Sequence, residues 1–501
     1  MDKNKKITIT FFVVVLFFTV FTAYYSHADS FPPEEDIADK EKEEKEQERD
    51  KESTEKDKEK AAEEKEKEEE KSKADHGFEF KYPDAVRGIY LTGHSAGGNR
   101  LETLLDLVDS TDLNSMVIDI KDDTGNITYK LEGTPYDEYS KNYISDPEGL
   151  LETLEEHEIY PIARIVVFKD SVYAPDNPEL SFRRSDGSIW RNNRGEAYVS
   201  PFKKEIWEYN LEIAKKAAEM GFQDIQFDYV RFPEGFENRE DSLDYSFGEY
   251  SEDSLMPRIH ENWEEETKQI EEKMKEAEEV IEDEVEVEED NNNNNDNDNS
   301  ESKKDNKTDA KEKDDGDKEI ENEEKEEEPE KPEYSYGLAR TQAITDFVEY
   351  AYQELEPYDV DVSVDIFGYT AVDMDAHGIG QNFLDISRNV DVISSMIYPS
   401  HWGPGYFGIP TPDTEPYRLT KEYVVRENKI LEQLEDPPIS RPWIQDFTAT
   451  WLGAGNYISY GKEEVEAQIR ALNEHGVEEF LIWDSNNNYS EGVDYTPLSN
   501  N

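Results

Sequence analysis

Residues 221–233 read Gly-Phe-Gln-Asp-Ile-Gln-Phe-Asp-Tyr-Val-Arg-Phe-Pro, and this stretch predicts a short buried strand, residues 224–230, that ends in charge. An amphipathic helix over about 203–220 precedes it, and Gly221 is placed to end that helix. Pro233 prevents further sheet pairing. Asp228, Tyr229 and Arg231 therefore lie at the carboxyl end of a strand, where parallel α/β folds build their sites. A structural Asp–Arg pair at a strand end is the alternative interpretation.

The same pattern of an apolar strand after a helix recurs along the chain. Strands are predicted over 86–91, 114–121, 160–168, 224–230, 360–368, 391–398, 442–447 and 479–484. The other helices are predicted over about 101–108, 146–157, 337–355, 415–434 and 462–475. Right-handed β–α repetition with eight strands closes an α/β (β/α)8 TIM barrel. An open doubly wound sheet is the alternative, but the glycine-rich loop at 92–98 lacks the phosphate-binding G-x-G-x-x-G form.

The N-terminus predicts export. Lys3, Lys5 and Lys6 precede an apolar run over 7–25, and Ser26-His27-Ala28 fits a cleavage site for a signal peptide. The run is also long enough for a membrane anchor, with the rest of the chain outside the cytoplasm in either case. We expect cleavage, which would make 1–28 a signal peptide and the protein secreted. Residues 29–80 form a Lys/Glu linker with too few apolar side chains to fold.

A second region of unusual composition, residues 237–335, interrupts the strand–helix alternation after the fourth strand. It opens with a stripe of mostly apolar residues at heptad spacing, which predicts a helical arm or a weak coiled coil: Trp263, Thr267, Ile270, Met274, Ala277 and Ile281. An Asn/Asp run over 291–299 and an acidic Lys/Glu tract follow, and both predict disorder. Because the alternation then resumes, we interpret the region as an acidic insertion between two halves of one barrel, residues 81–236 and 336–495.

Composition excludes several functions. The formal net charge is -68, which repels nucleic acid, so we expect no nucleic-acid partner. The chain has no cysteine, which excludes disulfides, a thiol nucleophile and zinc–thiolate sites. The histidines show no metal-binding spacing, so we expect neither a metal nor a cofactor. The sequence does not indicate an oligomeric state.

The predicted strand ends gather carboxylates and aromatic side chains, as carbohydrate sites do. Glycoside hydrolysis needs one protonated and one ionised carboxyl group, and the neighbouring fourth and fifth strands supply Asp228 and Asp365 as that pair. We expect Arg231 to hold Asp228 ionised, and Arg164 to need an anionic partner if it points inward. The expected substrate-binding residues are Asp119, Lys121, Arg164, Tyr229, Arg231, Tyr398, His401, Trp402, Asp446, Trp483, Asp484 and Asn486.

A serine-hydrolase elbow is the competing motif in the first half. Gly93-His94-Ser95-Ala96-Gly97 matches G-x-S-x-G, but it follows the first strand of the domain instead of lying deep in an α/β-hydrolase sheet. We therefore favour the carboxylate site over a serine nucleophile.

Six motifs resemble the hallmarks of a bacterial family of exported domains labelled "putative glycosyl hydrolase". They are Val86–Tyr90, Asp119–Asp122, Phe227–Pro233, Asp365–Gly368, Met396–His401 and Trp483–Asn487, and the resemblance covers about 86–236 and 337–489. It implies a TIM barrel related to alpha-amylase-like glycosidases, with no firm substrate.

From the resemblance and the strand-end carboxylates we expect a glycosidase that acts on a cell-envelope or environmental polysaccharide. The cleft gathers several carboxylates, so a neutral or cationic glycan is expected to bind best. A non-catalytic carbohydrate-binding or wall-associated scaffold is the alternative, since the same aromatic residues would serve it.

Overall fold

The computed structural model describes residues 77–265, 267–268, 331–373 and 375–496. The expected export segment, almost all of the expected linker and residues 269–330 of the expected insertion lie outside the described residues. Within the described part of the chain, no helix is long and apolar enough to cross a membrane.

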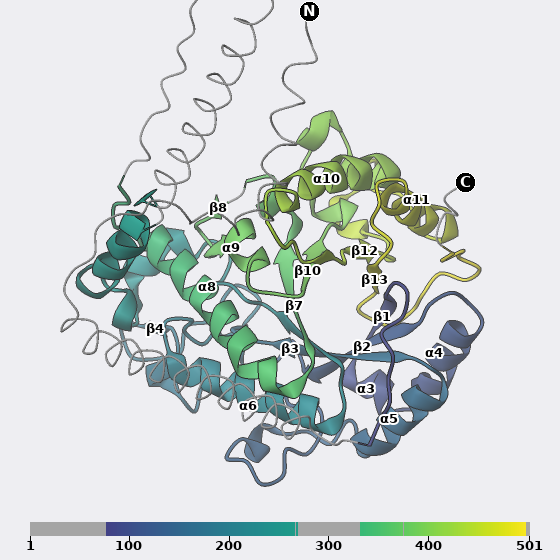
Figure 1. Cartoon of the computed structure of the whole chain (residues 1–501), viewed down its shortest axis with the longest axis horizontal. Helices are drawn as coiled ribbons and strands as arrows, with labels where there is room; N and C mark the ends of the chain where they lie inside the picture. Colours follow the sequence, from purple (N-terminus) through teal and green to yellow (C-terminus); the bar gives the residue numbers. More distant parts are fainter. Residues whose placement is uncertain (1–76, 266, 269–330, 374, 497–501) are drawn as a thin grey trace, which may run out of the picture. The chain divides into compact units, whose positions relative to one another are not determined.

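Eight parallel strands close into a barrel, which confirms the predicted fold (Figure 1). They follow the order β1-β2-β3-β5-β7-β10-β12-β13, and β13 pairs with β1 through Arg87 and Phe480. The strands are β1 (Arg87–Leu91), β2 (Ser115–Lys121), β3 (Tyr160–Val166), β5 (Asp224–Asp228), β7 (Asp361–Phe367), β10 (Val392–Met396), β12 (Trp443–Gln445) and β13 (Phe480–Trp483). A two-residue strand, β11 (Ile439–Ser440), pairs with β10 just before β12.

Helices surround the strands, as Figure 1 shows. They are α4 (Arg100–Asp109), α5 (Pro147–Glu156), α6 (Lys204–Met220), α8 (Tyr336–Leu355), α9 (Phe383–Ser387), α10 (Pro416–Leu431) and α11 (Lys462–Asn473). Gly221 ends α6 as predicted, with a φ of 123° that a side chain would oppose. The sequence did not predict α9 or the single-turn helix α3 (Gly93–Ala96), which replaces the expected glycine-rich loop.

Part of the region between β5 and α8 is folded against the barrel. Residues 252–265 are helical, in agreement with the start of the predicted arm, and the remaining stripe positions from Ile270 onward lie outside the described residues. A short pair of antiparallel strands, β4 (Arg183–Arg184) and β6 (Leu243–Asp244), joins this region to the long loop after β3. The Tyr250 hydroxyl donates to Asp346 Oδ2 of α8 at 2.8 Å.

Side chains alternate between two cores. The outer core lies between the strands and the helices, and it includes Ile225, Phe227 and Phe347. The inner core fills the barrel with Tyr90, Val117, Ile162, Trp443 and Leu481, among others. Because side chains of a strand point alternately to its two faces, Asp224, Gln226 and Asp228 of β5 all face the interior. Charged side chains therefore lie at both ends of the barrel interior, and Gln226 lies between them, where it donates to the Ser394 hydroxyl at 3.2 Å.

Candidate active site

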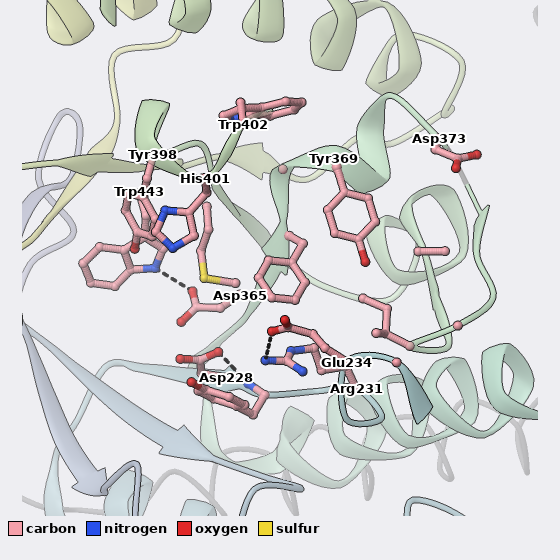
Figure 2. Close-up of a pocket in the computed structure, with 18 of the residues that line it drawn as sticks. Asp228, Arg231, Glu234, Asp365, Tyr369, Asp373, Tyr398, His401, Trp402 and Trp443 are labelled. Carbon is pink, nitrogen blue, oxygen red and sulfur yellow. Dashed lines mark hydrogen bonds and ion pairs between the residues drawn. The ribbon is translucent and has the colours of Figure 1, made fainter. Parts of the chain in front are cut away.

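A cavity of about 770 Å³ opens at the carboxyl end of the barrel strands. Its walls come from the segments that follow β5, β7 and β10 (Figure 2). Its acidic lining residues are Asp123, Asp228, Glu234, Glu237, Asp365 and Asp373, and its aromatic ones are Tyr229, Phe367, Tyr369, Tyr398, Trp402, Trp443 and Trp483. Carboxylates beside aromatic faces suit a ligand with both hydroxyl groups and apolar C–H faces.

Arg164 of β3 connects the acidic side chains at the floor of the cavity. Its guanidinium donates to Asp119 Oδ1 at 2.6 Å, to Asp123 Oδ1 at 3.1 Å and, from Nε, to Asp228 Oδ2 at 3.0 Å. A second nitrogen, Nη2, also contacts Asp228 Oδ2. The anionic partners expected for an inward-pointing Arg164 are therefore present. This compensation matters because the Arg164 side chain is only 1% exposed, and a buried charge without a partner is strongly destabilising.

Asp119 lies beneath Arg164 and does not line the cavity. It is 2% exposed, and its second oxygen accepts the Tyr90 hydroxyl at 2.6 Å. Burial raises the pKa of Asp119 to about 7, although Arg164 opposes that rise. The expected substrate contact of Asp119 is thus replaced by contacts to Arg164 and Tyr90.

The backbone turns sharply just after Asp228. Tyr229 has a φ of 53°, and its N–H donates to Asp228 Oδ1 at 2.5 Å. A positive φ is uncommon for a bulky aromatic residue and stores strain that the surroundings must offset. Here two cations contact the Tyr229 ring, with Lys169 Nζ 3.7 Å and the Arg231 guanidinium 4.6 Å from its centre. The turn ends β5 at Asp228, two residues before the predicted end, and fixes the carboxylate orientation.

Asp365 of β7 has a different environment from Asp228. It is 2% exposed, and its Oδ1 accepts the Trp443 Nε1–H at 2.7 Å. Burial first, and then the negative charge of Asp228, raise the pKa of Asp365 well above its usual range. Figure 2 shows the two carboxyl groups pointing toward one another at the floor of the cavity. One is therefore held by a guanidinium, and the other is favoured in its protonated form.

Arg231 lines the cavity but does not hold Asp228. Its guanidinium donates to the Phe232 carbonyl at 3.2 Å and pairs with Glu234 at 3.4 Å. It also stacks over the rings of Tyr229 and Phe367, each with its centre at 4.6 Å. The expected ion pair with Asp228 belongs instead to Arg164, since Arg231 lies beyond the turn at Tyr229.

Four other predicted residues, Tyr398, His401, Trp402 and Trp483, also line the cavity. The Trp483 ring stacks on Tyr90 with a centroid distance of 4.1 Å, and both rings lie beneath the Arg164 guanidinium. The His401 ring packs against Tyr398 at 5.1 Å, and burial lowers its pKa. A neutral imidazole at this place can accept or donate a hydrogen bond to a hydroxyl group.

Lys121 points away from the cavity, contrary to the prediction. Its Nζ pairs with Asp170 Oδ2 at 2.8 Å and donates to the Val166 carbonyl at 2.9 Å, and the side chain is fully buried. The pairing register shifts between Asp119, opposite Arg164, and Lys121, opposite Ile165. One extra residue in β2 therefore turns Lys121 to the outer face, because a shift by one position exchanges the two faces of a strand.

Asp446, Asp484 and Asn486 do not reach the cavity either. Asp446 accepts the Ser490 N–H at 2.8 Å and the Ser490 hydroxyl at 2.6 Å. Asp484 Oδ1 accepts the N–H groups of Asn486 at 2.8 Å and of Asn488 at 3.0 Å, and Asn486 is exposed. These carboxylates therefore stabilise the turn after β13 in the way that short acidic side chains commonly stabilise turns.

The prediction missed several lining residues, of which Trp443 and Tyr369 are the most informative. Trp443 lies inside the predicted strand 442–447, where its neighbour Ile444 is also apolar, so alternation did not indicate which of the two faces inward. Tyr369 and Asp373 come from the loop after β7, and Glu234 and Glu237 from the loop after β5. Loop residues such as these carry no periodic signal.

Ser95 of the competing elbow motif does not line the cavity. It lies in α3, where its N–H donates to Thr92 Oγ1 at 3.1 Å, and the neighbouring His94 ring packs on Tyr143 at 3.8 Å. The motif therefore forms a capped turn. Across the described ranges, no group of three or more His, Asp or Glu side chains is arranged to hold a metal ion.

The fold and the cavity together define a (β/α)8 barrel with a carboxylate-containing pocket at the carboxyl ends of its strands. The chain belongs to the family described as "Putative glycosyl hydrolase domain", whose model matches residues 88–489. This match confirms the resemblance inferred from the six motifs. A comparison with curated proteins gives no match.

Solved structures that resemble the chain include a hypothetical protein from Ruminiclostridium thermocellum, with 37% identity, a TM-score of 0.29, and coverage of 32% of this chain and 81% of that one. The glycoside hydrolase domain of PgaB (BpsB) from Bordetella bronchiseptica has 13% identity and a TM-score of 0.47, and the alignment covers 80% and 94% of the two chains. An alpha-galactosidase from Thermus thermophilus has 10% identity, a TM-score of 0.40, and coverage of 81% and 59%.

Proposed function

We propose that the barrel hydrolyses glycosidic bonds of a cell-envelope or environmental polysaccharide, with Asp365 as the general acid and Asp228 as the second carboxylate. The unequal environments of these two carboxyl groups carry the proposal. Burial and the Asp228 charge favour the protonated form of Asp365, whereas Asp228 accepts two contacts from the Arg164 guanidinium. Glycoside hydrolysis needs one protonated and one ionised carboxyl group.

In the proposed reaction Asp365 transfers its proton to the glycosidic oxygen as the bond to the anomeric carbon breaks. Trp443 donates to Asp365 Oδ1, which leaves Oδ2 to carry the proton. Asp228 either forms an ester bond to the anomeric carbon, which water then hydrolyses as Asp365 takes back a proton, or removes a proton from a water that attacks the anomeric carbon directly. The configuration of the released sugar, followed by NMR, distinguishes these two roles.

The charge of the cavity supports a neutral or cationic glycan. Six carboxyl groups line it, one of which is the proposed acid Asp365, so five carboxylates face three guanidinium groups from Arg164, Arg194 and Arg231. Lys121, a cation that was expected at the cavity, faces away. An anionic polymer would meet net repulsion at this site.

We also propose that the domain acts outside the cytoplasm, which is supported by the lysines and the apolar run at the N-terminus. Fractionation of the producing cells tests this. Recovery of the chain in the cytoplasmic fraction would contradict the proposal.

The direct test is Asp228→Asn, assayed on the polysaccharide that a screen of neutral, cationic and anionic glycans identifies. We expect turnover to fall by about a thousandfold, because the substitution removes the charge while keeping the shape. Asp109→Asn is the matched control, since Asp109 is an exposed carboxylate on α4 that pairs with His157. Unaltered turnover in Asp228→Asn with unaltered folding would contradict the proposal. Binding without hydrolysis by the parent would favour the non-catalytic scaffold.

A further inference from the structure

Trp451 is the most exposed large apolar side chain among the described residues. It is 64% exposed, whereas the others in this class range from 38% to 44%. It lies in a short 3₁₀ turn, η11 (Thr450–Leu452), in the loop that follows β12. Tryptophan is usually well buried, so an indole with this much free surface indicates an interaction site when it is part of a larger apolar feature.

Trp451 is part of such a feature, because a continuous row of rings joins it to the cavity. Its ring stacks on Phe447 with a centroid distance of 5.8 Å and an interplanar angle of 23°. Phe447 in turn makes edge contacts with Tyr398 at 5.8 Å and with His401 at 6.4 Å. Tyr398 and His401 line the cavity. The row therefore leads from the proposed site of bond cleavage to solvent.

The loop that carries the indole is fixed by its own contacts. Ala449, two residues before Trp451, is completely buried. The Leu452 N–H donates to the Ala449 carbonyl at 3.1 Å, and Asn456 Nδ2 donates to the Leu452 carbonyl at 3.0 Å. The Tyr460 N–H donates to Thr448 Oγ1 at 3.0 Å. A binding surface that is already ordered loses little conformational entropy when a ligand binds.

We infer that Phe447 and Trp451 form a separate subsite for a sugar unit of the same glycan chain whose cleaved bond lies in the cavity. The inference rests on the proposed function and deepens it. An indole face is broad, apolar and electron-rich, so it packs against the C–H face of a pyranose ring while the hydroxyl groups stay in water. No acidic side chain of the cavity is needed for this contact. The subsite gives the protein a preference for long chains over short oligosaccharides.

The test is affinity electrophoresis of the full chain carrying Asp365→Asn, which prevents cleavage. The gels contain one neutral or cationic polymer each: glycol chitosan, hydroxyethyl cellulose, xylan, dextran or pullulan. In the gel that retards this parent chain, Trp451→Ala is expected to weaken the apparent Kd by about tenfold, as the loss of a well-placed tryptophan does at binding sites. Trp451→Phe keeps a ring and is expected to recover most of the affinity. Tyr352→Ala is the matched control, because Tyr352 is a 39% exposed ring on α8.

Equal retardation of the parent and Trp451→Ala would overturn the subsite while leaving the proposed function intact, provided Asp228→Asn still abolishes turnover. Retardation of the parent by none of the polymers would overturn the subsite as well. A change in sedimentation of Trp451→Ala, with unchanged retardation, would assign the indole to contact with a second copy of the chain instead. Loss of retardation in Trp451→Ala but not in Tyr352→Ala supports the subsite. If the chain with Asp365 intact then hydrolyses nothing, only the proposed hydrolysis is contradicted.

Discussion

A buried arginine pairs with buried carboxylates at each end of the barrel, and the two clusters differ in what covers them. At the carboxyl end, Arg164 holds Asp119 and Asp228 under an open cavity. At the amino end, Arg441 pairs with Asp224 Oδ2 and with Glu479 Oε2, each at 2.7 Å. The Tyr82 hydroxyl, from the segment that precedes β1, accepts from Arg441 at 2.9 Å and donates to Glu479 at 2.8 Å.

Both clusters depend on the same strand, because Asp224 begins β5 and Asp228 ends it. Asp224 is fully buried, and Ser363 also donates to it at 2.5 Å. Asp228 keeps a side that faces the cavity. The comparison shows that a buried Asp–Arg pair is not by itself evidence of a catalytic site. Access to a cavity and a second carboxyl group nearby distinguish the carboxyl end.

The largest expected effect comes from Asp365→Asn, which removes the proposed acid from the carboxyl end. We expect turnover to fall by about a thousandfold or more, because an amide cannot deliver a proton to the leaving oxygen. The free energy of unfolding should not fall, since burial already favours a neutral group at this position. Steady-state kinetics and urea unfolding measure the two quantities. Full activity in this variant would mean that the cluster at the carboxyl end is not catalytic and is structural like the one at the amino end.

At the amino end the expected effect is on stability. Arg441→Met leaves the carboxylates of Asp224 and Glu479 buried without their cation, and we expect a loss of about 3–5 kcal/mol in the free energy of unfolding. The folded fraction should keep its kcat. If the variant fails to fold, Tyr82→Phe serves in its place, with an expected loss of about 1 kcal/mol from its two hydrogen bonds. A fall in kcat of folded Tyr82→Phe would mean that the amino end contributes to activity.

Glu427 provides a third environment for a buried carboxyl group, because among the described residues it contacts hydroxyl groups and no cation. Glu427 of α10 is fully buried, contacts the Ser440 and Ser395 hydroxyls, and has its pKa raised by burial to about 7. The folded state therefore binds the proton more tightly than the unfolded state does. Stability should fall as pH rises from about 4.5 to about 7, by about 3 kcal/mol in total. Glu427→Gln should remove this dependence, which urea unfolding at pH 5 and pH 8 measures. Parallel pH curves for the two proteins would contradict the assignment.

The smallest expected effect is on the pH profile of activity. Because burial and the charge of Asp228 raise the pKa of Asp365 well above its usual range, kcat/KM should fall as pH rises through that raised pKa. Beyond it the fall should approach about tenfold per pH unit. Tyr82→Phe should show the same alkaline limb, since Tyr82 lies at the amino end. An alkaline limb that persists in the residual activity of Asp365→Asn would assign the titration to another group.

The periodicity of the sequence predicted the barrel because the repetition of strand and helix admits few closed arrangements. Gly221 separated the helix from the strand that carries Asp228, and that strand and its neighbour bring Asp228 and Asp365 to one cavity. Seven of the twelve expected substrate-binding residues line the cavity: Arg164, Tyr229, Arg231, Tyr398, His401, Trp402 and Trp483. The other five expected residues do not line the cavity, and only contacts between segments distant in sequence show where their side chains lie.

The sequence by itself determined the order of the elements, and hence which side chains meet at the carboxyl ends of the strands. Only the tertiary structure decided which of them face the cavity. One extra residue in β2 turned Lys121 outward, and turns after the last strands engaged Asp446 and Asp484 with backbone N–H groups. The tertiary structure also pairs Asp228 with Arg164, which lies two positions before the end of β3, and not with Arg231, which is close in sequence. Such choices depend on single-residue register and on loop contacts, which hydrophobic periodicity does not encode.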